Sequence, residues 1–248
     1  MKKVQIGFPE LPEVASDSHF SILREWLRFC DDNHQCKPTG ISCLPTRLID
    51  LGSTDSPIIK LMETKPTDNM KYLALSHPWG DPPHFCTYTS NIDQHKKKIV
   101  FGELPATFQH AVTVTREIGF RYLWIDSICI VQGPDGDFNQ EAKRMEDVFS
   151  QAYCVIAATS ATGQHHGFLK PRERRRYLTF KREGQPQFYV CQFLDDFNEH
   201  VLEGHLNQRG WVLQERALAH RTIYFTNKQT YWECGGGVLC ETLTEMHK

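Results

Sequence analysis

Three apolar segments alternate with two amphipathic segments between residues 71 and 161, and this alternation limits the fold more than any other feature of the chain. None of the apolar segments shows the polar–apolar alternation of a strand that faces solvent on one side. The segments between them repeat apolar residues at helical spacing. Buried strands separated by helices predict a β-α-β-α-β core with a mostly parallel sheet. The predicted strands are KYLALS (71–76), RYLWIDSICIV (121–131) and YCVIAATSA (153–161), and the predicted helices lie in 104–119 and 139–152.

Shorter elements are predicted on both sides of this core. An amphipathic helix is expected within 19–36 and a strand pair in 45–52 and 57–64. After the core, we expect a strand at 188–194, a helix at 209–221 and a β-hairpin at 222–236. The stretch GGGVL between Cys234 and Cys240 suggests a flexible loop. The fold class is therefore α/β, with an N-terminal arm and helix (1–44) and a main domain (45–248) that ends in a β-hairpin.

Composition excludes some classes of function. The chain has 248 residues and a formal net charge of −2, whereas a dedicated nucleic-acid binder normally has a basic surface. No apolar run approaches the ~20 residues that cross a bilayer, so we expect no membrane span. The nine cysteines lie mostly inside apolar segments, which indicates free thiols in a reducing compartment and a cytoplasmic protein.

The first candidate site is the loop SHPWG at 76–80, which follows the first predicted core strand. In open α/β sheets, ligands bind in the crevice outside the carboxyl ends of the strands. Ser76 and the backbone of Gly80 would then contact a phosphate or a ribose. The alternative is a tight turn in which Trp79 is a hydrophobic plug.

The second candidate is Asp126, the one acid inside the apolar segment LWIDSICI. A carboxylate among bulky apolar residues must be paired or lie at the end of its strand, because burying an unpaired charge is costly. Asp126 is either a carboxylate at the floor of the crevice or a buried group that caps a loop or pairs with an arginine.

A third group is Cys30, His34, Cys36 and Cys43, which are four soft ligands within a short stretch. Zinc accepts such ligands tetrahedrally, but structural zinc sites usually contain a C-x2-C pair and this stretch has none. We therefore expect buried thiols, a surface histidine and no metal, with zinc at these four residues as the alternative. The phosphate-binding loops GxGxxG and GxxxxGK[ST] and the hydrolase motif GxSxG do not occur.

The fourth candidate is Glu215, in the stretch RGWVLQERAL at 209–218. In a helix, Trp211 and Glu215 share a face. One interpretation is an internal ion pair of Glu215 with Arg209 or Arg216. The other is a carboxylate presented to the crevice, with Trp211 as a wall of the pocket.

Several of these stretches together resemble, in order, the fungal heterokaryon-incompatibility (HET) domain. They are YLALSHPWG, LPATFQHAVTVTREIGFRYLWIDSICIVQ, EAKRMEDVFSQAYCVIAATSA and RGWVLQERALAHRTIYFT, preceded by the lead-in PTRLIDLG. The resemblance covers about residues 45–241, and it departs from the family at His77–Pro78, where a tyrosine and a small or β-branched residue are more common. It implies a role in fungal self/non-self recognition, in which an activated domain triggers programmed cell death.

The HET domain is in turn distantly similar to TIR domains, which have a flavodoxin-like parallel sheet and often cleave NAD⁺. That similarity implies that Glu215 is the catalytic glutamate of an NAD⁺ glycohydrolase (NADase) that is switched on by self-association. Six residues would then surround NAD⁺ or a related nucleotide: Ser76, Trp79, Gly80, Asp126, Arg209 and Trp211. The alternatives are a non-catalytic oligomerisation module that signals through protein partners, and a module that senses a nucleotide without cleaving it.

Overall fold

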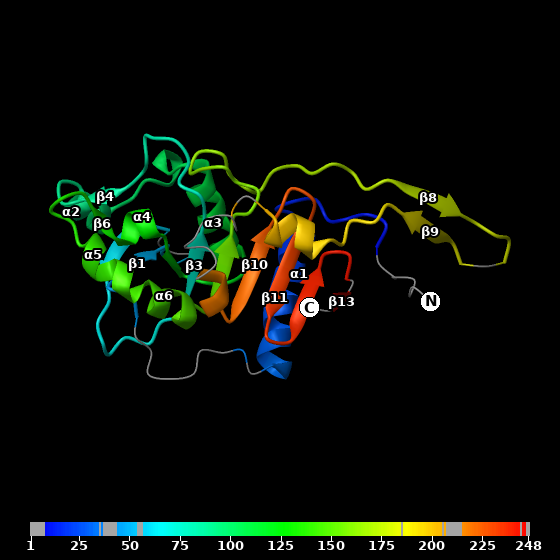
Figure 1. The fold of residues 1–248 in the computed structure, drawn as a ribbon, viewed down its shortest axis with the longest axis horizontal. Helices are drawn as coiled ribbons and strands as arrows, with labels where there is room; N and C mark the ends of the chain where they lie inside the picture. The colour runs from blue at the N-terminus through cyan, green and yellow to red at the C-terminus, as the bar shows by residue number, and fades with distance from the viewer. Residues whose placement is uncertain are drawn as a thin grey trace.

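The computed structural model describes residues 8–34, 36, 44–53, 57–184, 186–204, 206, 215–243 and 245–246. Four adjacent parallel strands form the centre of its main sheet (Figure 1). They are β3 (Tyr72–Ser76), β5 (Tyr122–Trp124), β7 (Cys154–Ala157) and β10 (Arg221–Phe225). Leu73 lies opposite Leu123 on one side and opposite Cys154 on the other. The predicted parallel core is therefore confirmed, and β10 extends it by one strand.

Antiparallel strands flank this centre on both sides. They are β1 (Arg47–Asp50) and β2 (Lys60–Glu63) beyond β5, and β11 (Thr230–Cys234), β12 (Gly237–Cys240) and β13 (Glu245–Met246) beyond β10. In the described residues the strand order is β13-β12-β11-β10-β7-β3-β5-β1-β2. The expected pair at 45–52 and 57–64 and the expected β10–β11 hairpin are confirmed. The GGGVL stretch does not form one flexible loop, because only Gly235 and Gly236 form a turn and β12, which pairs with β11, begins at Gly237.

The predicted strand at 121–131 is broken where the acid occurs. β5 ends at Trp124, a short helix α4 (Asp126–Cys129) follows, and β6 (Val131–Gln132) pairs with β4 (Thr87–Tyr88). The Asp126 carboxylate accepts the backbone N–H of Ser127 at 2.7 Å, and it lies in the first turn of α4, where a negative charge is favourable. Asp126 thus lies just past the carboxyl end of a central strand.

Helices flank the sheet, and the three longest of them share its main hydrophobic core. The flanking helices are α1 (Asp17–Asn33), α2 (Ile92–Lys97), η1 (Phe101–Glu103), α3 (Ala106–Glu117), α5 (Phe138–Glu141), η2 (Ala142–Arg144) and α6 (Met145–Gln151). Residues 139–152 are thus three short helical pieces where one helix was predicted. The helix predicted within 19–36 is α1, and its apolar residues Phe20, Leu23 and Trp26 belong to the same buried cluster as β3 and β5.

The part of the sheet that contains β10 lies between two hydrophobic clusters, one on each face. Ile223 and Phe225 of β10 belong to the large cluster, whereas Tyr224 belongs to a smaller one with Val201. Val201 lies in η3 (Asn198–Leu202), which covers this second face. Consecutive side chains of a strand point to opposite faces, so the sheet is buried on both sides here.

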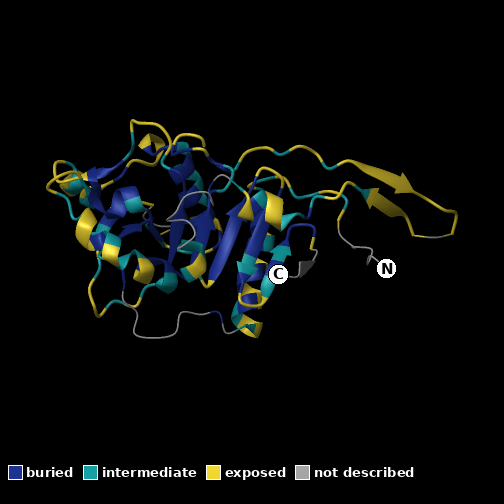
Figure 2. Cartoon of the chain, in the orientation of Figure 1, coloured by how far each residue is buried: buried dark blue, intermediate teal, exposed yellow. Residues whose placement is uncertain are grey.

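A two-stranded hairpin extends away from the sheet (Figure 1). It consists of β8 (Tyr177–Phe180) and β9 (Phe188–Cys191), which lies within the predicted strand at 188–194. Its strands are exposed almost throughout (Figure 2). No helix in the described part of the chain is long and apolar enough to cross a membrane. No disulfide joins the eight cysteines that the structure describes.

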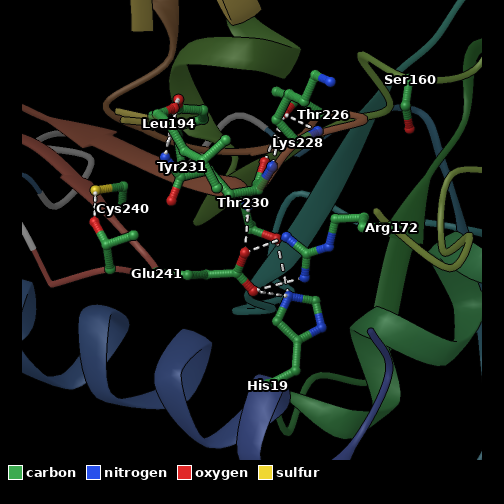
Figure 3. Close-up of polar contacts among 12 residues, drawn as sticks. His19, Ser160, Arg172, Leu194, Thr226, Lys228, Thr230, Tyr231, Cys240 and Glu241 are labelled. Atoms are coloured by element: carbon green, nitrogen blue, oxygen red, sulfur yellow. Dashed lines mark hydrogen bonds and ion pairs between the residues drawn. The ribbon is translucent and has the colours of Figure 1, made fainter. Parts of the chain in front are cut away.

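A buried ionic cluster ties the N-terminal helix to the C-terminal strands (Figure 3). The Glu241 carboxylate is bonded by both guanidinium Nη atoms of Arg172 and by the backbone N–H of Thr230, and it lies 3.1 Å from Nε2 of His19 in α1. Burial alone would raise the pKa of Glu241, but the contacts with His19 and Arg172 outweigh it and lower this pKa to about 2. Glu241 is therefore a buried carboxylate held in its charged form.

Candidate functional site at the carboxyl ends of β3 and β5

A cavity of about 270 Å³ lies where the two central strands β3 and β5 end. After β3, the loop contributes His77 and Trp79, and after β5 the chain contributes Asp126. Glu215 reaches the same cavity from the helical turn at 215–218. The other lining residues are Leu75, Trp124, Ile130, Gln132, Phe138, Ala142, Met145 and Phe149.

The topology explains why a cavity opens at this edge. From β3 the chain passes to β5 on one side of it, and from β5 it crosses to β7 on the other side. The loops that follow β3 and β5 therefore leave the sheet next to a reversal of strand order. Ligands of open α/β sheets bind in the crevice outside the strand ends at such a point.

Asp126 is held by hydrogen bonds. The indole Nε1–H of Trp79 donates to Oδ2 at 2.6 Å, and the backbone N–H of Ser127 donates to Oδ1 at 2.7 Å. Nε2 of His77 lies 3.9 Å from Oδ1. The side chain of Asp126 keeps 25% of its exposure, so the carboxylate is oriented by two donors and still accessible from the cavity. These bonds link Trp79 to Asp126, and Trp79 is thus more than a hydrophobic plug.

Glu215 is anchored to the end of β3. The hydroxyl of Ser76, the last residue of that strand, donates to Oε2 of Glu215 at 2.5 Å. Arg216, one of the two cations expected to pair with Glu215, points elsewhere, because its guanidinium bonds both carboxylate oxygens of Glu233 at 3.0 and 3.1 Å. Arg209 and Trp211, which were expected beside Glu215, lie outside the described residues.

Gly80 was predicted to contact a phosphate or a ribose through its backbone. It is not among the residues that line the cavity. Its backbone is left-handed (φ +73°), and a Cβ at this position would lie 2.6 Å from the Cα of Gly163. The loop after β3 therefore packs directly on the loop after β7, where the N–H of Gln164 also donates to the Trp79 carbonyl at 3.1 Å. Gly80 allows this approach and thereby fixes the position of Trp79.

The apolar wall of the cavity was not predicted. Phe138 and Phe149 come from the broken helical segment, and Phe149 lies edge-on to Trp124 with ring centroids 5.6 Å apart. Trp124 could have been found from the sequence, because it lies only two positions before the candidate acid Asp126. Phe138 carried no comparable signal, because its place depends on the loop that precedes it.

That loop, at 131–138, is held by one acid and one arginine. Oδ1 of Asp137 accepts the N–H of Val131 at 2.8 Å, while Oδ2 bonds the buried guanidinium of Arg47 in β1. Arg47 also donates from Nε to the Cys129 carbonyl at 2.7 Å, at the end of α4. A Cβ at Gly136 would lie 2.1 Å from the Val131 carbonyl oxygen, so the turn requires glycine there. These contacts present Phe138 to the cavity.

The site combines negative charge with aromatic surface. Asp126 and Glu215 contribute two carboxyl groups, and no lysine or arginine lines the cavity among the described residues. Two carboxylates can orient hydroxyl groups and stabilise a positive charge that develops on a bound molecule. Cys129 does not line the cavity, and its burial raises the pKa of its thiol to about 12, which disfavours the thiolate that a nucleophile requires.

The residues that could hold a metal do not line this cavity. Cys30, His34 and Cys36, three of the four residues considered for zinc, lie together, whereas Cys43 is outside the described residues. The fourth member of the group is Cys234 at the end of β11. Sequence spacing gave no signal for Cys234, because it is far along the chain from the other three.

Comparison with known proteins identifies the family. No curated protein and no solved structure matches the chain. The family model described as "Heterokaryon incompatibility protein (HET)" matches residues 72–215, more than half of the 248 residues. The match begins at β3 and ends at Glu215, so it contains the whole of the cavity lining. The chain therefore belongs to the heterokaryon incompatibility (HET) family.

Proposed function

We propose that this HET protein hydrolyses NAD⁺ to nicotinamide and ADP-ribose at the cavity, with Glu215 as the catalytic residue. The observation that carries the proposal is the placement of Glu215: Ser76 holds it at the end of β3, and it lines the same cavity as Asp126. The Glu215 carboxylate is thereby oriented by the last residue of β3, and the Asp126 carboxylate lies just after the neighbouring strand β5.

The chemistry requires little more than such a carboxylate. The bond between ribose C1′ and the nicotinamide ring nitrogen breaks, and its electron pair stays with neutral nicotinamide. The sugar passes through an oxocarbenium-like state, as in glycoside hydrolysis, and Glu215 stabilises that positive charge. A water oxygen then bonds to C1′, and its proton passes through Glu215 to the solvent. Nicotinamide is a good leaving group, so the reaction needs no strong general acid.

The cavity suits the nicotinamide half of the substrate. Its volume of about 270 Å³ is near the lower end of the roughly 300–1,000 Å³ of small-molecule sites. It therefore fits a nucleoside-sized part of the dinucleotide, and the remainder would extend outside. The pyridinium ring of NAD⁺ is cationic and flat, and Trp79, Trp124 and Phe138 together with the acids offer it aromatic faces and negative charge.

The topology agrees with this assignment. Numbered along the chain, the four parallel strands β5-β3-β7-β10 have the order 2-1-3-4, with which the flavodoxin-like sheet begins. TIR domains share that sheet, and the W-x3-E pattern of Trp211 and Glu215 resembles their catalytic segment. In the biological role that the family indicates, loss of NAD⁺ would be the cause of cell death, and self-association would switch the activity on.

The test is product analysis with the purified chain. Incubation with NAD⁺ at high protein concentration is expected to release nicotinamide and an ADP-ribose product in equal amounts. Glu215→Gln is expected to stay folded and to release both products about 10²–10³-fold more slowly. Glu63→Gln, which removes the carboxylate of a surface ion pair with Lys96, serves as the matched control and is expected to behave as wild type. If the wild-type chain leaves NAD⁺ intact at high protein concentration, the proposal is contradicted.

The β8–β9 hairpin favours a second candidate function, a module that signals by self-association without catalysis. Leu178 and Phe188 in its strands are 66% and 56% exposed, and Phe193, two residues after β9, is 64% exposed. An isolated two-stranded hairpin with open edges pairs readily with another strand, and a second copy of the hairpin is the occupant we expect. Leu178→Ser combined with Phe188→Ser would then abolish self-association in sedimentation. Cell killing that survives Glu215→Gln but not the hairpin substitutions would favour this function over NAD⁺ cleavage.

A further inference from the structure

A cluster of soft metal ligands joins the N-terminal helix to the C-terminal hairpin. Cys30 lies in the last turn of α1, His34 follows that helix, and Cys36 comes two residues later. Cys234 is the last residue of β11. The three Sγ atoms and a ring nitrogen of His34 all lie within 4.8 Å of one another. Four ligand atoms from two distant parts of the chain thus meet in one place.

The spacing of these atoms matches a tetrahedral metal site. With Zn–S bonds of about 2.3 Å and Zn–N bonds of about 2.0–2.1 Å, neighbouring ligand atoms of a tetrahedron lie roughly 3.5–3.8 Å apart. Sγ of Cys234 and Nδ1 of His34 are 3.3 Å apart in the structure. Cys30, Cys36 and Cys234 are all at least nine-tenths buried. The set therefore needs only small movements to close around an ion.

The turn after Cys234 is shaped around the cluster. A Cβ at Gly236 would lie 2.1 Å from Cε1 of His34, and one at Gly235 would lie 3.1 Å from Sγ of Cys36. The backbone of this turn therefore lies directly against two of the four ligands. The N–H of Gly236 also donates to Sγ of Cys234 at 3.3 Å, a bond of the kind that supports a metal-bound thiolate from outside the coordination shell.

Charge near the cluster also favours a metal-bound state. The guanidinium of Arg221 has no exposed surface, and it pairs at 2.8 Å with Asp31, the residue after Cys30. Arg221 is also the register partner of Cys234 across β10 and β11. Three thiolates, one neutral imidazole and one Zn²⁺ carry a net charge of −1, and the buried guanidinium of Arg221, which it shares with Asp31, partly offsets that charge.

We infer that Cys30, His34, Cys36 and Cys234 bind one Zn²⁺ ion as a structural site. Binding replaces three thiol protons, which are released to the solvent, and leaves the oxidation state of zinc and sulfur unchanged. Four protein ligands fill the tetrahedron, so no position stays open for a substrate. The ion would tie the end of α1 to the β11–β12 hairpin. The contact of His19 with Glu241 makes a similar connection near the start of the same helix. Since none of the four lines the cavity, the inference is independent of the proposed function.

Metal analysis of the full chain tests this inference. Protein purified without chelator is expected to carry one zinc per chain by elemental mass spectrometry. Removing zinc with a strong chelator is expected to lower the thermal midpoint, and added Zn²⁺, but not Mg²⁺, is expected to restore it. Substoichiometric zinc in protein grown with ample zinc overturns the site, as does a disulfide between any two of the three cysteines in freshly purified protein.

Substitutions locate the metal. Cys234→Ser and His34→Ala are expected to lose the bound zinc, whereas Cys240→Ser, which changes another buried thiol of the same hairpin, is expected to keep it. Equal loss of zinc in Cys240→Ser would contradict the assignment. If Cys234→Ser fails to fold, cobalt substitution of the wild-type chain decides: a tetrahedral Co²⁺ spectrum with thiolate charge-transfer bands supports the site, and an octahedral spectrum overturns it.

Discussion

Ser76 and Glu215 are hydrogen bonded at 2.5 Å although 139 residues separate them. Ser76 is the last residue of a central strand, and Glu215 lies at the end of the segment that matches the HET family. The contact thus joins the first and last parts of the family segment, and it fixes a carboxylate beside the crevice of the sheet.

Ser76→Ala tests whether this bond positions the glutamate. A hydrogen bond to a charged group contributes about 1.5–3 kcal/mol, so we expect kcat for NAD⁺ cleavage to fall by roughly 10–100-fold while KM changes little. Ser76→Thr keeps the hydroxyl and is expected to recover most of the rate. An equal fall in both variants, or a rise in KM alone, would show that Ser76 acts through folding or binding instead.

Asp126→Asn removes a charge from the cavity and keeps the shape of the side chain. We expect KM for NAD⁺ to rise by about tenfold, because the cationic ring loses an electrostatic partner of about 1–2 kcal/mol. The thermal midpoint should also fall somewhat, because the single amide oxygen can accept only one of the two N–H groups, from Ser127 and Trp79, that the carboxylate accepts. Asp93→Asn, at an exposed position in α2, is the matched control and should leave KM unchanged. An unchanged KM in Asp126→Asn would place the nicotinamide ring elsewhere.

Gly80→Ala tests the close packing that holds the loop after β3. The substitution combines strain at φ +73° with a Cβ at 2.6 Å from the Cα of Gly163, and we expect a loss of about 2–4 kcal/mol in the free energy of unfolding. Gly184 has a similar φ of +72° but no atom within 4 Å of its Cβ position. Gly184→Ala should therefore lose only about 1–2 kcal/mol. Equal losses in urea denaturation would mean that the contact with Gly163 is unimportant.

The buried carboxylate of Glu241 makes stability depend on pH. The contacts lower its pKa to about 2 in the folded protein from about 4.5 for a free glutamate, so its contribution is complete above about pH 4.5 and is lost as the pH falls through 2. The expected loss is on the order of 3 kcal/mol. Glu241→Gln should flatten the dependence of the free energy of unfolding over this range.

The matched control for that prediction is Glu25→Gln. Glu25 forms an exposed ion pair with Arg28 on α1, and solvent screens such a pair strongly. This variant should keep the pH dependence of the wild type. If Glu241→Gln and wild type unfold with the same pH dependence between pH 5 and pH 3, the contacts with His19 and Arg172 do not stabilise the charged form.

Hydrophobic patterning was enough to predict the central architecture. The three apolar segments became β3, β5 and β7, because strands buried on both faces carry no polar alternation. The cost of burying a charge left two alternatives for Asp126, a paired position or the end of a strand, and the structure places it just past a strand end. The same rule should have ended the second strand earlier, since the chain leaves β5 two residues before Asp126.

The contacts between distant segments could not be predicted in this way. Hydrophobic patterning does not show that Arg216 bonds Glu233 or that Ser76 bonds Glu215. Each bond joins two segments that are separate in the sequence, and their relative position is not encoded in either segment alone. Nor does spacing bring Cys234 to Cys30, since the two meet only after α1 packs against the hairpin. Tertiary packing decides both.

The rate of nicotinamide release from NAD⁺ by Glu215→Gln, relative to wild type and to Glu233→Gln, tests the central claim most directly. Glu233→Gln breaks the neighbouring ion pair with Arg216 and leaves the cavity lining unchanged. We predict a loss of about 10²–10³-fold for Glu215→Gln at saturating NAD⁺, and a rate within a few-fold of wild type for Glu233→Gln, with both variants folded. A Glu215→Gln protein that still releases nicotinamide at the wild-type rate would contradict the account.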